Sequence, residues 1–125
     1  ALPIFAVLLD CDDSIRRRAA KVLGEIRDPS AVPALISLLH DEYYSVRREA
    51  AAALVSIGAP AMDAVVSALV DPDDDVRKRA ADVLAEIGDA RAVDPLRSLL
   101  NDPDWYVQRA AEDAIEQITH RADEG

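Results

Sequence analysis

The apolar positions of the chain follow the period of an α-helix, and they form two kinds of stripe. The shorter stripe places leucines at i, i+3 and i+4, as in Leu35, Leu38 and Leu39. The longer stripe places aliphatic residues at i, i+4, i+8 and i+11, as in Val46, Ala50, Leu54 and Ile57. Neither stripe alternates as a strand would. The pattern therefore predicts a short helix followed by a longer one.

This two-helix pattern occurs four times along the chain. Equivalent positions of the longer stripe lie 30 or 31 residues apart, at Ile15, Val46, Val76 and Val107. The repeats run approximately over residues 1–29, 30–59, 60–90 and 91–120, followed by a tail at 121–125. One pair of helices cannot bury two apolar faces alone, whereas stacked pairs cover one another. We therefore predict an all-α fold, a right-handed α-solenoid of four helical hairpins that forms a single domain over residues 1–125.

The ends of the longer helices carry the expected capping residues. Asp12, Asp73 and Asp104 stand where an N-cap belongs, because a short acceptor side chain there can bind the free N–H groups of the first turn. Gly58 and Gly88 follow the longer helix, where a left-handed C-cap is favoured. These residues predict the boundaries of the second helices.

The repeated motif also resembles a known family. The second repeat reads A-V-P-A-L-I-x-L-L-x-D, then V-R-x-x-A-A, then L and I-G. This pattern is similar to the short HEAT-like repeat of phycobilisome lyases and related proteins, and all four copies carry it. The resemblance implies an α-solenoid whose second helices line the concave face. Such repeats serve as scaffolds, as subunits and in a few enzymes.

An aspartate and a cation six residues apart recur near the start of each second helix. The pairs are Asp10 and Arg16, Asp41 and Arg47, Asp71 and Arg77, and, with the charge lost, Asp102 and Gln108. A cation near a helix N-terminus is unfavourable, so each arginine needs an acidic or carbonyl partner. The resemblance implies that such pairs form a ladder between neighbouring repeats. We expect these residues to be structural.

A second set of cations occupies equivalent positions one residue further on. Its members are Arg17, Arg48, Lys78 and Arg109. One turn later, Asp82 and Asp113 can form i,i+4 ion pairs with the last two of them. We interpret this column as part of a partner-binding face, and the alternative is a solvated helix surface with local ion pairs.

Four of the five aromatic residues are predicted to lie in the turns between paired helices. They are Tyr43, Tyr44, Trp105 and Tyr106. Amphipathic aromatic side chains at an exposed edge are typical interface anchors. The alternative is that they pack over the ends of adjacent helices.

The two ends of the repeat array differ in their outer faces. Glu112 and Glu116 replace small or apolar residues of the earlier repeats, which predicts a solvent-facing C-terminal cap. Phe5 and Leu9 lie where later repeats have polar residues. We therefore expect an apolar patch there that either self-associates or meets a preceding repeat.

Charge and composition exclude several classes of function. The 24 acidic and 14 basic residues give a net charge of −10, which disfavours nucleic acid and anionic membrane surfaces as partners. No apolar run is long enough to cross a membrane, and no signal peptide is visible, so we expect a cytoplasmic protein. Asp71, Asp73 and Asp75 have the spacing of a calcium loop, but Val76 stands where that loop needs glycine. We expect no metal or cofactor.

These observations predict a non-catalytic scaffold that binds another protein through the second-helix face and the aromatic turns. The alternative, which the family resemblance implies, is a bilin lyase or isomerase subunit acting on phycobiliprotein-like substrates. In that case the basic column could supply cations to the acidic propionates of a tetrapyrrole.

Overall fold

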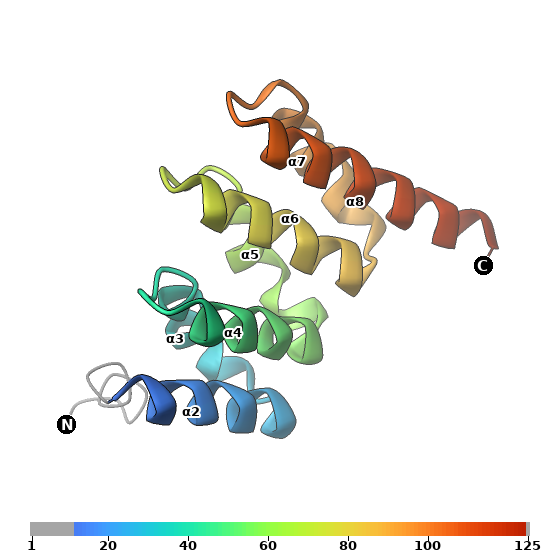
Figure 1. Cartoon of the computed structure of the whole chain (residues 1–125). Coiled ribbons are helices and arrows are strands. Elements are labelled where there is room, and N and C mark those ends of the chain that lie inside the picture. The colour runs from blue at the N-terminus through green and yellow to red at the C-terminus, as the bar shows by residue number, and fades with distance from the viewer. Residues whose placement is uncertain (1–11, 125) are drawn as a thin grey trace. The chain divides into compact units, whose positions relative to one another are not determined.

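The structure, a computed structural model, describes residues 12–124 of the chain (Figure 1). All regular structure in that range is helical, which confirms the predicted all-α fold. The chain forms two compact units that divide between Ala61 and Met62. The predicted first helix of repeat 1, with Asp10, Phe5 and Leu9, lies outside the described residues.

Unit 1 contains one helical hairpin and the long helix that precedes it. Its elements are α2 (Asp13–Ile26), the short 3-10 helix η1 (Pro29–Ala31), α3 (Val32–Leu38), α4 (Tyr44–Ile57) and the 3-10 helix η2 (Ala59–Ala61). Helix α3 pairs with α4, and α2 packs along α4 (Figure 1). The second helices of repeats 1 and 2 are therefore direct neighbours.

Unit 2 contains two complete hairpins. Its elements are α5 (Met62–Ala68), α6 (Asp74–Ile87), η3 (Ala90–Ala92), α7 (Val93–Arg97), the 3-10 helix η4 (Ser98–Asn101) and α8 (Trp105–Glu124). Helix α5 pairs with α6, α7 and η4 pair with α8, and α6 packs along α8. The second helices α6 and α8 therefore pack along one another as α2 and α4 do in unit 1.

The predicted N-caps are present at three of the four second helices. The carboxylate of Asp12 accepts a hydrogen bond from the N–H of Ser14, and that of Asp73 accepts one from Asp75. Asp104 does the same for Tyr106 at the start of α8. Each aspartate thus satisfies an N–H group that the helix itself leaves without a partner.

The helix ends agree with the sequence only in part. Gly88 has the left-handed conformation expected of a C-cap, with φ 76° and ψ 16°. Gly58 also has a positive φ, but its ψ of −132° lies outside the left-handed region. After α2, a left-handed cap is formed by Arg27, which is not a glycine.

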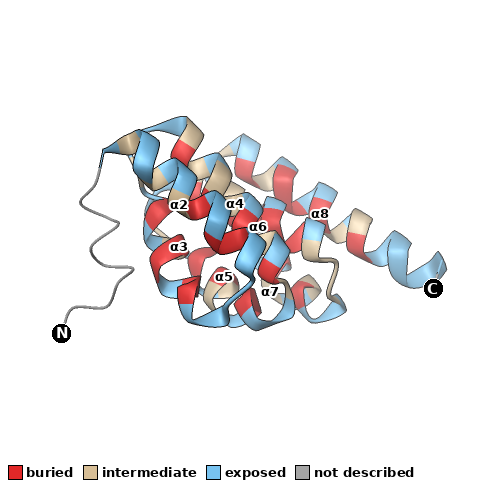
Figure 2. Ribbon diagram, turned by 90° about the horizontal axis from the view of Figure 1, so that it is seen from below, coloured by how far each residue is buried: buried red, intermediate tan, exposed pale blue. Residues whose placement is uncertain are grey.

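The long apolar stripe forms the core of repeats 2 to 4. Val46, Val76 and Val107 are buried, as the periodicity predicts. Figure 2 shows buried positions recurring along the second helices α4, α6 and α8. The equivalent Ile15 on α2 is 48% exposed, unlike its three counterparts, so its predicted burial is not found. The first helix predicted to pack against it lies outside the described residues.

Helices α2 and α4 approach one another closely at Gly24. A Cβ atom on Gly24 would lie 2.9 Å from the Cα atom of Ala53, which is closer than real Cβ atoms come. The absence of a side chain at Gly24 therefore sets the distance between the two helices.

The predicted C-terminal tail is helical. Helix α8 continues through Glu124, so His120 and residues 121–124 of the tail expected at 121–125 belong to this helix. Thr119 stands where Gly58 and Gly88 end the earlier second helices, so no left-handed cap interrupts α8.

The added turns of α8 reach back to α6. The guanidinium of Arg121 donates hydrogen bonds to the carbonyl oxygens of Ala85 and Glu86, at 3.3 Å and 3.1 Å. The side-chain amide of Gln117 also donates to the carbonyl of Ala85. A cation at the last carbonyls of a helix is favourable with the helix dipole, so Arg121 caps α6.

Candidate functional site

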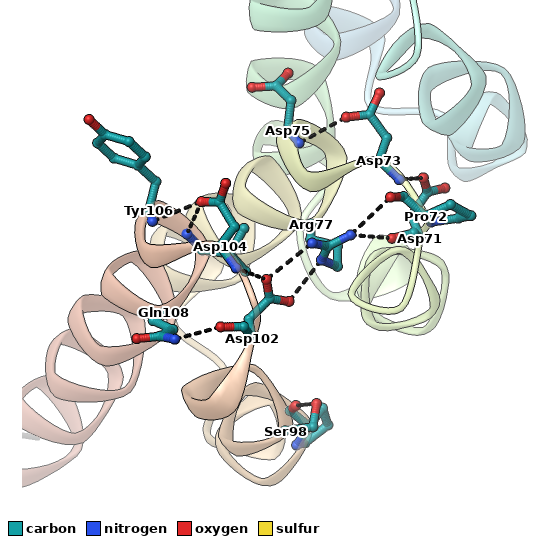
Figure 3. A network of polar contacts seen from close by, with 12 residues as sticks. Asp71, Pro72, Asp73, Asp75, Arg77, Ser98, Asp102, Asp104, Tyr106 and Gln108 are labelled. Atoms are coloured by element: carbon teal, nitrogen blue, oxygen red, sulfur yellow. Dashed lines mark hydrogen bonds and ion pairs between the residues drawn. The ribbon is translucent and has the colours of Figure 1, made fainter.

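The ladder residues of unit 2 form a network that joins repeats 3 and 4 (Figure 3). The guanidinium of Arg77 donates two hydrogen bonds to the carboxylate of Asp102, at 2.8 Å and 3.0 Å. The Nη1 atom of Arg77 donates two further hydrogen bonds, to the carbonyl oxygens of Asp71 and Pro72. The arginine therefore pairs with the carboxylate of the following repeat. The aspartate six residues before it, in the same repeat, contributes its backbone carbonyl and not its carboxylate.

Unit 1 contains the same arrangement between repeats 1 and 2. Arg16 donates two hydrogen bonds to Asp41, at 2.6 Å and 3.2 Å. Arg47 donates to the carbonyl oxygen of Asp41 from within the same repeat. In repeat 4, Gln108 donates to the carbonyl of Asp102 where the other repeats have arginine. Gln108 has no charge, but its side-chain amide keeps the hydrogen bond to the backbone carbonyl six residues before it.

Both ladder aspartates are held in their ionised form. Burial alone would raise the pKa of Asp102, but the hydrogen bonds from Arg77 and from the N–H of Asp104 outweigh it, and the pKa is lowered. The pKa of Asp41 is lowered against the same burial, by Arg16 and the N–H of Tyr43. The carboxylates of Asp41 and Asp102 therefore have a structural role, because each is already bound by a guanidinium and a backbone N–H.

The basic column behaves differently in the two units. In unit 2, Lys78 forms an ion pair with Asp82 at 3.1 Å, and Arg109 lies 3.5 Å from Asp113. In unit 1, Arg17 and Arg48 are exposed, and neither has an ion-pair partner among residues 12–124. The cations of unit 1 are therefore the ones open to a ligand.

A groove lies between α2 and α4 on the side of the predicted partner-binding face. Its volume is about 540 Å³. It is lined by Lys21, Gly24, Glu25 and Arg27 of repeat 1 and by Glu49, Ala52, Ala53 and Ser56 of repeat 2. We call this the α2–α4 groove.

Sequence reasoning missed the α2–α4 groove. It exists because Ala52 and Ser56 are small where repeat 3 has Asp82 and Glu86. The only signal was this local change of size within an otherwise regular repeat, together with Gly24 at the point of closest helix approach.

The four aromatic residues are exposed, and only Tyr43 lies in a turn between paired helices. Tyr43 is the N-cap of α4, and Tyr44, Trp105 and Tyr106 belong to first helical turns. Trp105 and Tyr106 are 62% and 66% exposed. Their rings pack edge to face, with the ring centroids 5.3 Å apart.

The described part of the chain contains no group of three or more His, Cys, Asp or Glu side chains arranged to hold a metal ion. Asp71, Asp73 and Asp75 instead bind backbone N–H groups or arginine side chains. Within residues 12–124, no single helix is long and apolar enough to cross a membrane, although the bent pair 44–57 and 59–68 would pass on length and composition together.

The sequence matches the family of HEAT repeats over residues 2–70 and again over 62–124, which together cover nearly the whole chain. No curated protein matches it. The solved structures that it resembles are repeat proteins of the α-solenoid type, in agreement with the predicted fold class.

Three of these structures illustrate the similarity. An engineered protein is 29% identical, with a TM-score of 0.53 over 93% of this chain and 61% of its own. A designed armadillo repeat protein is 21% identical, with a TM-score of 0.50 over 91% of this chain and 63% of its own. The complex of CpcE and CpcF of phycocyanin lyase from Nostoc sp. PCC7120 contains a chain that is 27% identical, with a TM-score of 0.50 over 96% of this chain and 66% of its own. This chain thus spans less than two thirds of the engineered proteins that it resembles.

Proposed function

Because the chain belongs to the HEAT repeat family, we propose that it is a non-catalytic scaffold that binds another protein. The binding surface consists of the second-helix face and the aromatic residues at the starts of α4 and α8. The observation that carries this proposal is the α2–α4 groove, which lies between two helices whose ladder pair, Arg16 and Asp41, is already bound together.

The groove has the properties of a peptide-binding surface. Its floor is formed by small residues, Gly24, Ala52 and Ala53, so a partner side chain can reach the backbone of both helices. Lys21 and Glu49 stand on its walls and supply charges of both signs. Such a surface binds by shape and by a few directed polar contacts.

Filling the groove tests this function. Ala52→Arg places a long side chain in the groove from an exposed helix position, so it should abolish capture of a partner without loss of helical circular dichroism. Ala90→Arg makes the same change at an exposed position outside the groove and serves as the control. Partners retained by the wild type and by both variants alike would refute the groove as the binding site.

The aromatic residues are tested separately. If Trp105 and Tyr44 are interface anchors, the double alanine variant should lose about 2 kcal/mol or more of binding per anchor while its melting temperature stays close to wild type. Loss of stability with retained binding would assign them to packing.

A bilin lyase or isomerase subunit is the second candidate. It is favoured by the similarity to a phycocyanin lyase complex and by the exposed cations Arg17 and Arg48, which have no ion-pair partner in the described part of the chain and could bind propionate groups. Absorbance spectra of the protein mixed with free bilin test it. A stable spectral shift that is lost in the Arg17→Ala, Arg48→Ala double variant supports the lyase function, and no shift contradicts it.

A further inference from the structure

The outer face of α8 is not purely polar. A hollow of about 520 Å³ lies there, lined by the apolar residues Leu100 and Ile115, by three acidic residues, and by Thr119 and His120. The acidic residues are Glu112, Glu116 and Asp123. Leu100 is 37% exposed, whereas the equivalent Leu69 of repeat 3 is buried. The predicted solvent cap is thus an acidic rim around an open apolar surface, which we call the α8 hollow.

Repeat 3 shows what covers this place when another repeat follows. Ile115 is equivalent to Leu84 of α6, and Leu84 is fully buried in unit 2, where α6 packs along α8. Ala114 of α8, which is equivalent to Ala53 of α4, is also fully buried. In unit 1, Ala53 lies against Gly24 of the preceding second helix, and Gly24 is equivalent to Ala85 of α6 and to Glu116 of α8. The element that fits the α8 hollow is therefore a second helix with an aliphatic residue at the position of Ala114.

Helix α2 presents such a residue. Val22 is equivalent to Ala53 and Ala114, which are buried, yet it is 49% exposed. It is flanked by three cations, Arg17, Arg18 and Lys21, and by one acidic residue, Glu25. The three cations are exposed and have no ion-pair partner among residues 12–124. This face of α2 is an aliphatic knob inside a basic rim, the reverse of the α8 hollow.

We propose that the chain self-associates head to tail, with the Val22 face of α2 in one copy seated in the α8 hollow of another. The aliphatic side chains of Val22, Leu100 and Ile115 supply the apolar contact. The cations around Val22 face the carboxylates of Glu112 and Glu116, so the charges across the contact are opposite.

The distribution of charge over the chain supports the same pairing. Unit 1 has eight acidic and seven basic residues, whereas unit 2 has sixteen acidic and seven basic. Almost all the net negative charge therefore lies in the unit that carries the α8 hollow. Long-range attraction brings α2 of one copy towards unit 2 of another at low ionic strength.

The two faces are different surfaces, so the contact is heterologous. Each added copy leaves one α2 face and one α8 hollow uncovered, and association continues as concentration rises unless a ring closes. Since the rims are charged and exposed, salt weakens the contact.

Charge reversal with complementation tests the proposal. Sedimentation equilibrium of the full chain from about 10 µM to about 1 mM should show an average mass that rises with concentration at low salt and falls again in about 0.5 M NaCl. Arg18→Glu on α2 and Glu116→Arg on α8 should each weaken association by about tenfold or more. An equimolar mixture of the two variants should associate again, because the altered faces are complementary to one another.

The control is Arg48→Glu, which changes the net charge as Arg18→Glu does but lies outside both faces, so it should associate like the wild type. Circular dichroism of each variant checks that all remain folded. A wild type that stays monomeric at about 1 mM and low salt overturns the proposal. So does association that neither charge reversal weakens, or a mixture that does not recover.

Discussion

At the residue scale, the ladder aspartates are the positions where a single substitution has the largest predicted effect. Asp102→Ala leaves the guanidinium of Arg77, whose side chain is only 14% exposed, without its carboxylate. We expect a loss of about 2–4 kcal/mol of unfolding free energy in urea titrations. Asp94→Ala removes an exposed partner of Arg97 and should cost less than about 1 kcal/mol. Equal losses in the two variants would contradict a structural role for the ladder.

The same carboxylates predict how stability responds to acid. The pKa values of Asp41 and Asp102 are lowered in the folded protein, and the Arg91 hydrogen bond lowers that of Asp89 to about 2. A lowered folded pKa adds stability above the unfolded pKa of about 4, and this stability is lost as pH falls through the folded value. The melting temperature should therefore decline steadily below about pH 4.

Asp74 contributes with the opposite sign. Its hydrogen bond with Asp104 raises its pKa, so its contribution is present at low pH and is lost as pH rises through the raised value. We expect Asp74→Asn to be at least as stable as the wild type at pH 7, by thermal melting. A destabilised variant at pH 7 would show that the Asp74 carboxylate makes a favourable contact that outweighs its repulsion from Asp104.

At the element scale, a substitution at Gly24 sets helix propensity against the close packing of α2 on α4. Helix propensity alone predicts that Gly24→Ala stabilises α2 by up to about 1 kcal/mol. The new Cβ atom would lie 2.9 Å from the backbone of Ala53, so α2 and α4 would have to move apart. We expect the clash to dominate, with a net loss of about 1–3 kcal/mol in denaturant unfolding. A more stable variant would show that the helices can separate at little cost.

Arg121 offers a second test at this scale. Arg121→Ala removes the cap on the carbonyl groups of Ala85 and Glu86 and should cost about 1 kcal/mol. Amide hydrogen exchange should become faster in the last turn of α6 and in the last turns of α8. The matched variant Arg109→Ala removes an exposed arginine from the same helix and should leave exchange in α6 unchanged.

At the scale of the whole molecule, the parts that could be predicted from the sequence are those that each repeat specifies for itself. Val46, Val76 and Val107 recur at fixed spacing because every hairpin buries the same stripe, and Asp73 and Asp104 cap helices through local bonds. The hairpins, their order and the positions of the ladder residues follow from this repetition.

The features that escaped prediction depend on departures from the repeat. The α2–α4 groove follows from small side chains at Ala52 and Ser56, and its depth depends on how closely two helices approach. The extension of α8 follows from a missing glycine at Thr119, and its contact with α6 needs the three-dimensional register of Arg121. The period of the apolar residues specifies neither the distance between α2 and α4 nor the register of α8 against α6.

The ladder has a further consequence, for the speed of folding. Arg16 with Asp41, and Arg77 with Asp102, each join residues only 25 positions apart, and they tie neighbouring second helices together. Closing so short a loop costs little chain entropy, and proteins rich in such near-neighbour contacts have low contact order and fold fast. Each unit can therefore form its interhelical ties while the chain is still emerging during synthesis, as soon as the aspartate that follows an arginine by one repeat length is available.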